Sequence, residues 1–83
     1  MEKEHEPLPV AGYTAQPAER IDLVNDNKLA EERLLRMLDA LAAAPDRIDP
    51  RWLAIARTNF EIGFMSLNRS IFRPRRVALP GDV

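Results

Sequence analysis

Cysteine is absent from the sequence. A disulfide framework and a thiolate metal site are therefore excluded, and an intracellular location is permitted. The single histidine, His5, belongs to no ligand motif, and the sequence contains no HExxH, calcium-loop or Gly-rich phosphate motif. Ser66 and Ser70 have no histidine near them in the sequence, as a serine nucleophile would need. We expect a binding protein without metal or cofactor, not an enzyme.

An excess of one charge is absent too, because 12 Lys+Arg stand against 13 Asp+Glu. Non-specific nucleic-acid binders are usually strongly basic, so we expect no DNA partner. No apolar run approaches the roughly 20 residues that span a bilayer, which predicts no membrane partner. The N-terminal stretch MEKEHEPLPV also lacks the apolar segment of a secretory signal peptide. A cytoplasmic protein is expected.

A chain of 83 residues provides one small domain. Residues 1–12 are rich in glutamate and proline and form a flexible N-terminal arm in this interpretation. Residues 13–73 form a helical hairpin domain, and residues 74–83 form a C-terminal tail. The predicted fold class is all-α: an antiparallel helical hairpin with an N-terminal arm.

Prolines mark the expected helix ends. Pro17 suits the first turn of a helix that continues to about Ala43, just before Pro45. Asp49-Pro50 is typical of an N-cap followed by a first-turn proline, and this second helix continues to about Phe72.

Each predicted helix carries two apolar stripes when every residue is advanced by about 100°. On the first helix, one stripe consists of Leu23, Ala30, Leu34, Met37, Leu38 and Leu41, and the other of Ile21, Val24, Leu35 and Ala42. On the second helix, one stripe consists of Leu53, Phe60, Phe64, Leu67 and Ile71, and the other of Ile55, Ile62, Met65 and Phe72. A strip of small residues, including Gly63, lies between them. One stripe per helix closes the hairpin and the other needs another chain, so we expect an obligate homo-oligomer.

Two long cations interrupt the stripes assigned to contacts between chains. Lys28, the last residue of the polar run NDNK, falls on the line of Ile21 and Val24, and Arg69 falls on the line of Ile62. Buried cations are costly unless an anion pairs with them, so these positions favour an anionic ligand at the subunit interface.

Plainer interpretations of both cations stay open. Lys28 can pair with Glu31 or Glu32 on its own helix, and Arg69 can offset the helix dipole near a C-terminus. Tyr13, which follows Gly12, can stack on a base or cover the hairpin.

Three stretches together resemble a known family: GYTAQ, RIDLVNDNKLAEERLLRMLDAL and DPRWLAIARTNFEIGFMSLNRSIFRP. They resemble the phage anti-CBASS sponges, which are related to the Thoeris anti-defence sponges. The resemblance extends over roughly residues 10–75. It implies a homohexamer of helical hairpins in the host bacterial cytoplasm. Such a protein sequesters cyclic oligonucleotide messengers, such as 3′,3′-cyclic GMP–AMP, without cleaving them, and so blocks CBASS effectors.

The resemblance also implies roles for four residues. Tyr13 would stack on a base and Lys28 would meet a phosphate of a cyclic dinucleotide, with the Thr14 hydroxyl beside them. Arg69 would point at the phosphates of a cyclic trinucleotide, the second ligand class. The alternative is a structural or RNA-binding helical hairpin that uses Arg73, Arg75 and Arg76 for phosphates.

Overall fold

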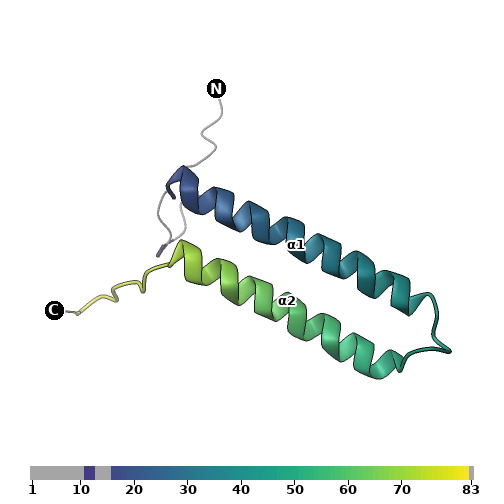
Figure 1. Cartoon of the computed structure of the whole chain (residues 1–83). Coiled ribbons are helices and arrows are strands. Elements are labelled where there is room, and N and C mark those ends of the chain that lie inside the picture. The colour runs from purple at the N-terminus through teal and green to yellow at the C-terminus, as the bar shows by residue number, and fades with distance from the viewer. Residues whose placement is uncertain (1–10, 13–15, 83) are drawn as a thin grey trace.

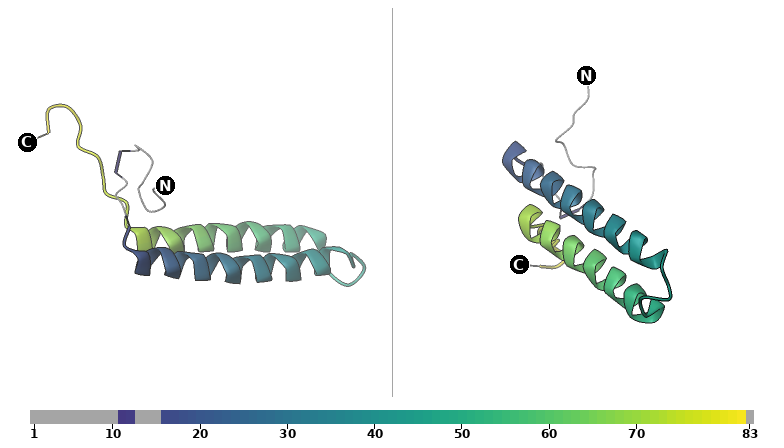
Figure 2. Two further views of the ribbon diagram at one scale, coloured as in Figure 1. Left: turned by 90° about the horizontal axis from the view of Figure 1, so that it is seen from above. Right: turned by 45° about the vertical axis from the view of Figure 1, so that its right-hand side comes forward.

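The computed structural model describes residues 11–12 and 16–82 of the chain. Helix α1 comprises Ala18–Ala42 and helix α2 comprises Pro50–Phe72. The two helices lie side by side and antiparallel, so that the start of α1 and the end of α2 meet at one end of the molecule (Figure 1). The view from above shows the same alignment (Figure 2). The all-α hairpin that the sequence predicts is therefore confirmed.

The second helix begins as its sequence predicts. The Asp49 carboxylate accepts hydrogen bonds from the backbone N–H groups of Arg51 and Trp52, at 2.9 and 3.4 Å. Pro50 is the first helical residue, where its missing N–H costs no hydrogen bond. Ile48 and Leu53 are both half-buried and line one small cavity, as an apolar contact across the cap requires.

The first helix begins one residue later than the position of Pro17 suggests. Pro17 is the N-cap, with φ −63° and an extended ψ of 150°, and does not belong to the first turn. Its carbonyl oxygen accepts from the N–H groups of Arg20 and Ile21, at 3.0 and 3.2 Å. Proline fixes φ but leaves ψ free, so it can adopt the extended cap conformation, although it supplies no side-chain hydrogen bond there.

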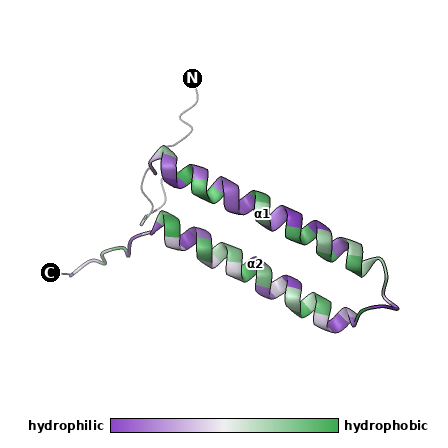
Figure 3. Cartoon of the chain, viewed as in Figure 1, coloured by the Kyte–Doolittle hydropathy of each residue, from purple (hydrophilic) through white to green (hydrophobic). Residues whose placement is uncertain are grey.

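The core between the helices is small. Val24 and Leu38 are the only buried apolar residues in the part of the chain that the structure describes. Hydrophobic residues nevertheless recur along the whole length of both helices (Figure 3). The hairpin thus buries only part of its apolar surface.

The stripes of α1 agree with the prediction only in part, because Leu38, on the stripe assigned to close the hairpin, is buried at 3% exposed. Val24, which was assigned to contacts between chains, is 4% exposed and faces α2. Leu23 and Met37, which were assigned to the stripe that closes the hairpin, are 47% and 53% exposed. Both stripes are similarly apolar, so periodicity alone cannot select between them.

On α2 the prediction agrees with the structure only in part. Phe64 is half-buried and Met65 is exposed as expected, but Phe60 and Leu67, assigned to the stripe that closes the hairpin, are 41% and 45% exposed.

Candidate ligand-binding site

Asn27, in the middle of the polar run NDNK, links the two helices. Its side-chain amide donates to the Oδ1 atom of Asn68 at 3.1 Å, and both residues are half-buried. A buried amide that is hydrogen-bonded avoids most of the cost of leaving water. Asn27 therefore fits between the helices despite its polarity.

The hydrogen bond between the asparagines also places the two candidate cations. Lys28 follows Asn27 and Arg69 follows Asn68, so the cations lie on neighbouring turns of the two helices. Seen from one end, antiparallel right-handed helices turn in opposite senses, so residues that follow a facing pair turn to the same side. Lys28 and Arg69 consequently lie on one side of the hairpin, and both are exposed.

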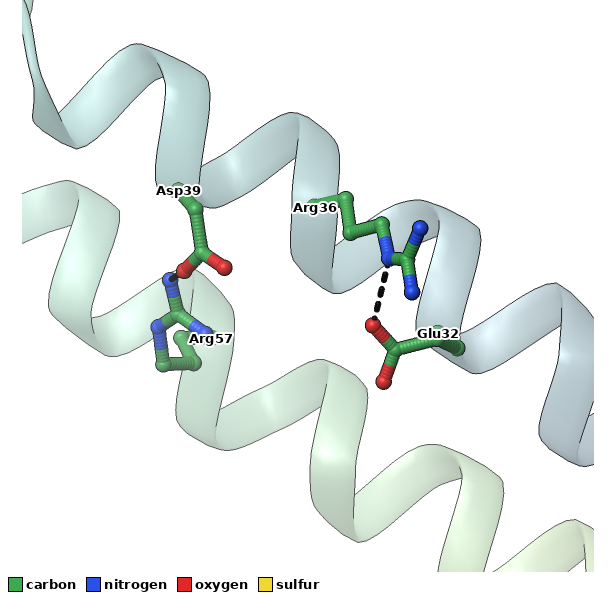
Figure 4. Close-up of polar contacts among 4 residues, drawn as sticks. All are labelled: Glu32, Arg36, Asp39 and Arg57. Atoms are coloured by element: carbon green, nitrogen blue, oxygen red, sulfur yellow. Dashed lines mark hydrogen bonds and ion pairs between the residues drawn. The ribbon is translucent and has the colours of Figure 1, made fainter.

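Neither candidate cation is neutralised by the hairpin itself. Glu32, the partner that a surface lysine at position 28 would use, instead binds Arg36 at 2.8 Å (Figure 4). A second ion pair joins Arg57 to Asp39 across the helices at 2.6 Å (Figure 4). Within residues 11–12 and 16–82, no carboxylate pairs with Lys28 or Arg69. Both cations are available to an external anion, although Arg69, in the last turn of α2, also suits the helix dipole.

Two apolar surfaces flank the hairpin. The first apolar surface is between 39% and 53% exposed and consists of Leu23, Met37, Leu41, Phe60 and Leu67. Leu23, Met37 and Leu67 directly precede residues between the helices and so turn away from Lys28. Leu41 and Phe60 lie four and seven residues from Met37 and Leu67, on the same helical lines. The second apolar surface consists of Ile62 and Met65, which are 49% and 66% exposed and lie seven and four residues before Arg69, on its side of α2. The candidate cations thus share their side with exposed apolar groups.

A shallow cavity adjoins the first apolar surface. It has a volume of about 160 Å³ and is lined by Asn59, Phe60, Gly63, Phe64 and Leu67. A Cβ atom added to Gly63 would meet nothing within 4 Å. The glycine is therefore not required by the packing of the hairpin itself.

Tyr13 and Thr14 lie outside the described residues, but the chain on either side of them is fixed to the end of α2. The N–H of Arg75 donates to the carbonyl oxygen of Gly12 at 2.7 Å. The side-chain amide of Gln16 donates to the carbonyl oxygen of Phe72 at 3.0 Å. By contrast, Lys28 lies about 15 Å along the helix from Ala18, at 1.5 Å per residue. The structure places Lys28 and Arg69 on one side of the hairpin, next to the bond between Asn27 and Asn68, and leaves Lys28 well separated from the start of α1.

Sequence reasoning missed every contact that joins distant parts of the chain. The pairs Asn27–Asn68 and Asp39–Arg57 are nested around the connection between the helices, as residues of an antiparallel hairpin must be. The position of the connection in the sequence could therefore have predicted which residues of the two helices face each other. The bond between Gly12 and Arg75 leaves no pattern in the sequence, because it joins two backbone groups.

Other kinds of site find little support in the described residues. Those residues contain no group of three or more His, Cys, Asp or Glu side chains arranged to hold a metal ion. None of the described helices is both long and apolar enough to cross a bilayer.

Comparison with known proteins assigns this helical hairpin to a family. The chain matches the model of the Acb2/Tad1 hairpin domain over residues 6–72. No curated protein and no solved structure matches it. The match includes both helices, the NDNK run and both candidate cations. The chain is therefore a member of the Acb2/Tad1 hairpin family, the anti-CBASS and anti-Thoeris sponges of cyclic nucleotides.

Proposed function

We propose that this protein binds and sequesters cyclic di- and trinucleotide messengers, such as 3′,3′-cyclic GMP–AMP, and so prevents activation of CBASS effectors in the host bacterial cytoplasm. The protein releases its ligand unaltered and is not an enzyme. The observation that carries the proposal is membership of the sponge family over residues 6–72. Its structural support is that Lys28 and Arg69 are exposed and form no ion pair within the described residues.

The chemistry of these residues suits the ligand. A cyclic dinucleotide carries two phosphates and two aromatic bases. Lys28 contributes a charge-assisted hydrogen bond to a phosphate, and the Tyr13 ring stacks on a base, with the Thr14 hydroxyl nearby. Stacking contributes about 1–3 kcal/mol per base. Two copies of each residue bring about −12 kcal/mol, the free energy of nanomolar binding, within reach.

The dimensions of the hairpin favour a site shared by two chains. Lys28 lies about 15 Å from the start of α1, whereas the chain around Tyr13 is bound to the end of α2. A second hairpin can bring its own Lys28 to that end. Arg69 lies within about one turn of the end of α2, a position from which copies from several chains can converge on a trinucleotide.

The exposed apolar surfaces support assembly beyond a dimer. The first and second apolar surfaces lie on opposite sides of α2, because Phe60 and Ile62 differ by about 200° around the helix. Burial of exposed apolar area stabilises association by about 25 cal/mol per Å². One surface can close a two-chain contact and the other a second contact, as a hexamer requires.

Calorimetric titration of the full chain with 3′,3′-cyclic GMP–AMP tests the proposal. The bound ligand is then released by heating and analysed by chromatography. We expect nanomolar binding and intact nucleotide. Lys28→Ala and Tyr13→Ala should each weaken binding while the mass of the assembly stays unchanged.

Two results would overturn this function. A linear nucleotide in the released fraction would indicate an enzyme. If the parent binds no nucleotide and Lys28→Ala or Tyr13→Ala only disrupts the assembly, the structural or RNA-binding hairpin is favoured. Its phosphate contacts would come from Arg73, Arg75 and Arg76.

A further inference from the structure

The chain that follows α2 turns back on the N-terminal segment. Arg73 ends the helix in the left-handed conformation, with φ 51° and ψ 57°, and its N–H still bonds to the carbonyl oxygen of Arg69 at 2.8 Å. Two residues later, the N–H of Arg75 donates to Gly12 at 2.7 Å. The intervening Pro74 is half-buried. The segment Arg73–Val77 thus contacts the chain directly before Tyr13.

Glycine is required at position 12 for two independent reasons. Its φ of +88° is a conformation that residues with a side chain rarely adopt. A Cβ atom at this position would also collide with the carbonyl oxygen of Arg75 and touch Val77. The obstructing atom belongs to the backbone, so it cannot move aside as a flexible side chain could.

A second contact completes the attachment. Gln16 donates to the carbonyl oxygen of Phe72 at 3.0 Å, so the chain is bound to the end of α2 both before and after residues 13–15. The family match ends at residue 72, and the segment that bonds to Gly12 lies beyond it. This chain therefore supplies one of the two attachments from outside the shared hairpin domain.

We propose that Gly12 and the segment Arg73–Val77 are positioning residues for nucleotide binding, because they fix the chain next to Tyr13 before the ligand arrives. The inference rests on the proposed function. Ordering a residue's backbone costs about 1–2 kcal/mol, and a binding event that must order free chain loses that amount of affinity. The segment acts through its backbone N–H and not through the charge of its arginines.

The first test compares Gly12→Ala with Gly81→Ala in the full chain, using 3′,3′-cyclic GMP–AMP in calorimetry. Gly81 is the matched control, because its φ of +95° imposes the same backbone strain while an added Cβ meets nothing within 4 Å. We expect Gly12→Ala to raise Kd by about tenfold or more, the loss of one or two ordered residues. Gly81→Ala should leave Kd unchanged. Helicity and assembly mass should stay as in the parent for both variants.

A second pair of variants separates the backbone from the charge. Arg75→Pro removes the donor N–H, whereas Arg75→Ala keeps it and removes only the guanidinium. We expect Arg75→Pro to weaken binding as Gly12→Ala does, and Arg75→Ala to bind like the parent. Equal losses in both Arg75 variants would show that the arginine charge acts on the ligand, and this would overturn the inference.

A measurement without ligand tests the positioning role of the Gly12–Arg75 bond, and the binding results separate that role from the proposed function. Hydrogen exchange of the Arg75 amide should be slow in the parent and fast in Gly12→Ala. Fast exchange in the parent would overturn the positioning role directly. If the parent binds no cyclic nucleotide, the proposed function fails. If the parent binds and Gly12→Ala binds equally well, only this inference fails.

Discussion

Gly63 offers the sharpest test of how the hairpins assemble. It lies in the middle of α2, where glycine costs about 1 kcal/mol relative to alanine. It is exposed, and an added Cβ would meet nothing within 4 Å in a single chain. For an isolated hairpin, Gly63→Ala should therefore stabilise the fold by about 1 kcal/mol.

If the hairpins assemble by packing on the strip of small residues that includes Gly63, Gly63→Ala should instead weaken the assembly. Gly63 lines the shallow cavity between Phe60 and Leu67, where another helix can approach the backbone closely. A methyl group inserted into a packed contact typically costs about 1–3 kcal/mol. The gain in helix propensity is the same in the free hairpin and in the assembly, so it does not offset this cost on association. We expect Gly63→Ala to shift the assembly toward smaller species, and Gly63→Leu to shift it further.

Sedimentation velocity over a range of concentrations measures the shift, and thermal unfolding followed by circular dichroism measures the stability. Asn25→Ala is a suitable control, since it raises helix propensity at an exposed position of α1. An unchanged sedimentation coefficient in both Gly63 variants, with a raised Tm for Gly63→Ala, would refute the reasoning. The contacts between chains would then have to avoid the first apolar surface.

Three further predictions concern single contacts. Asn68→Leu should destabilise the fold by about 1–3 kcal/mol in denaturant unfolding, because it leaves the Asn27 amide without its partner, and the additional change Asn27→Leu should recover most of that loss. Lys28→Ala should weaken binding of 3′,3′-cyclic GMP–AMP in calorimetry by about tenfold or more, as expected for a lost charged hydrogen bond. Arg36→Ala, whose cation is already bound to Glu32, should leave that affinity unchanged. Asp49→Ala should lower the free energy of unfolding by about 1 kcal/mol, since two N–H groups lose their acceptor; an unchanged midpoint would contradict the importance of this cap.

Local backbone chemistry made most of the fold predictable. Asp49 and Pro50 define the start of α2, and the prolines at positions 45 and 74 limit the helices, through interactions within a few residues. The burial of Val24 was not predictable from such local interactions. Its stripe and the stripe of Leu23 are both apolar, and only the position of α2 decides which becomes buried.

The candidate site was predictable to a smaller extent. Periodicity singles out Lys28 and Arg69 as cations on apolar lines, and the structure shows both exposed without an ion pair among the described residues. Their common side of the hairpin depends on the hydrogen bond between Asn27 and Asn68, which joins residues 41 apart. Tyr13 and Thr14 were suggested only by the family resemblance, and their roles stay predictions.

The bond between Gly12 and Arg75 links the segment that precedes α1 to the segment that follows α2. A protease that cuts after the exposed Arg75 or Arg76 would release the residues that follow, including Val77 beside Gly12, whereas the N–H of Arg75 would keep its bond to Gly12. The connection between the helices lies at the far end of the molecule (Figure 1), and its backbone hydrogen bonds are local, from Ala44 to Leu41 and from Arg47 to Ala44. Purification tags are therefore better inserted in that connection, between Ala44 and Ile48, than fused at either terminus.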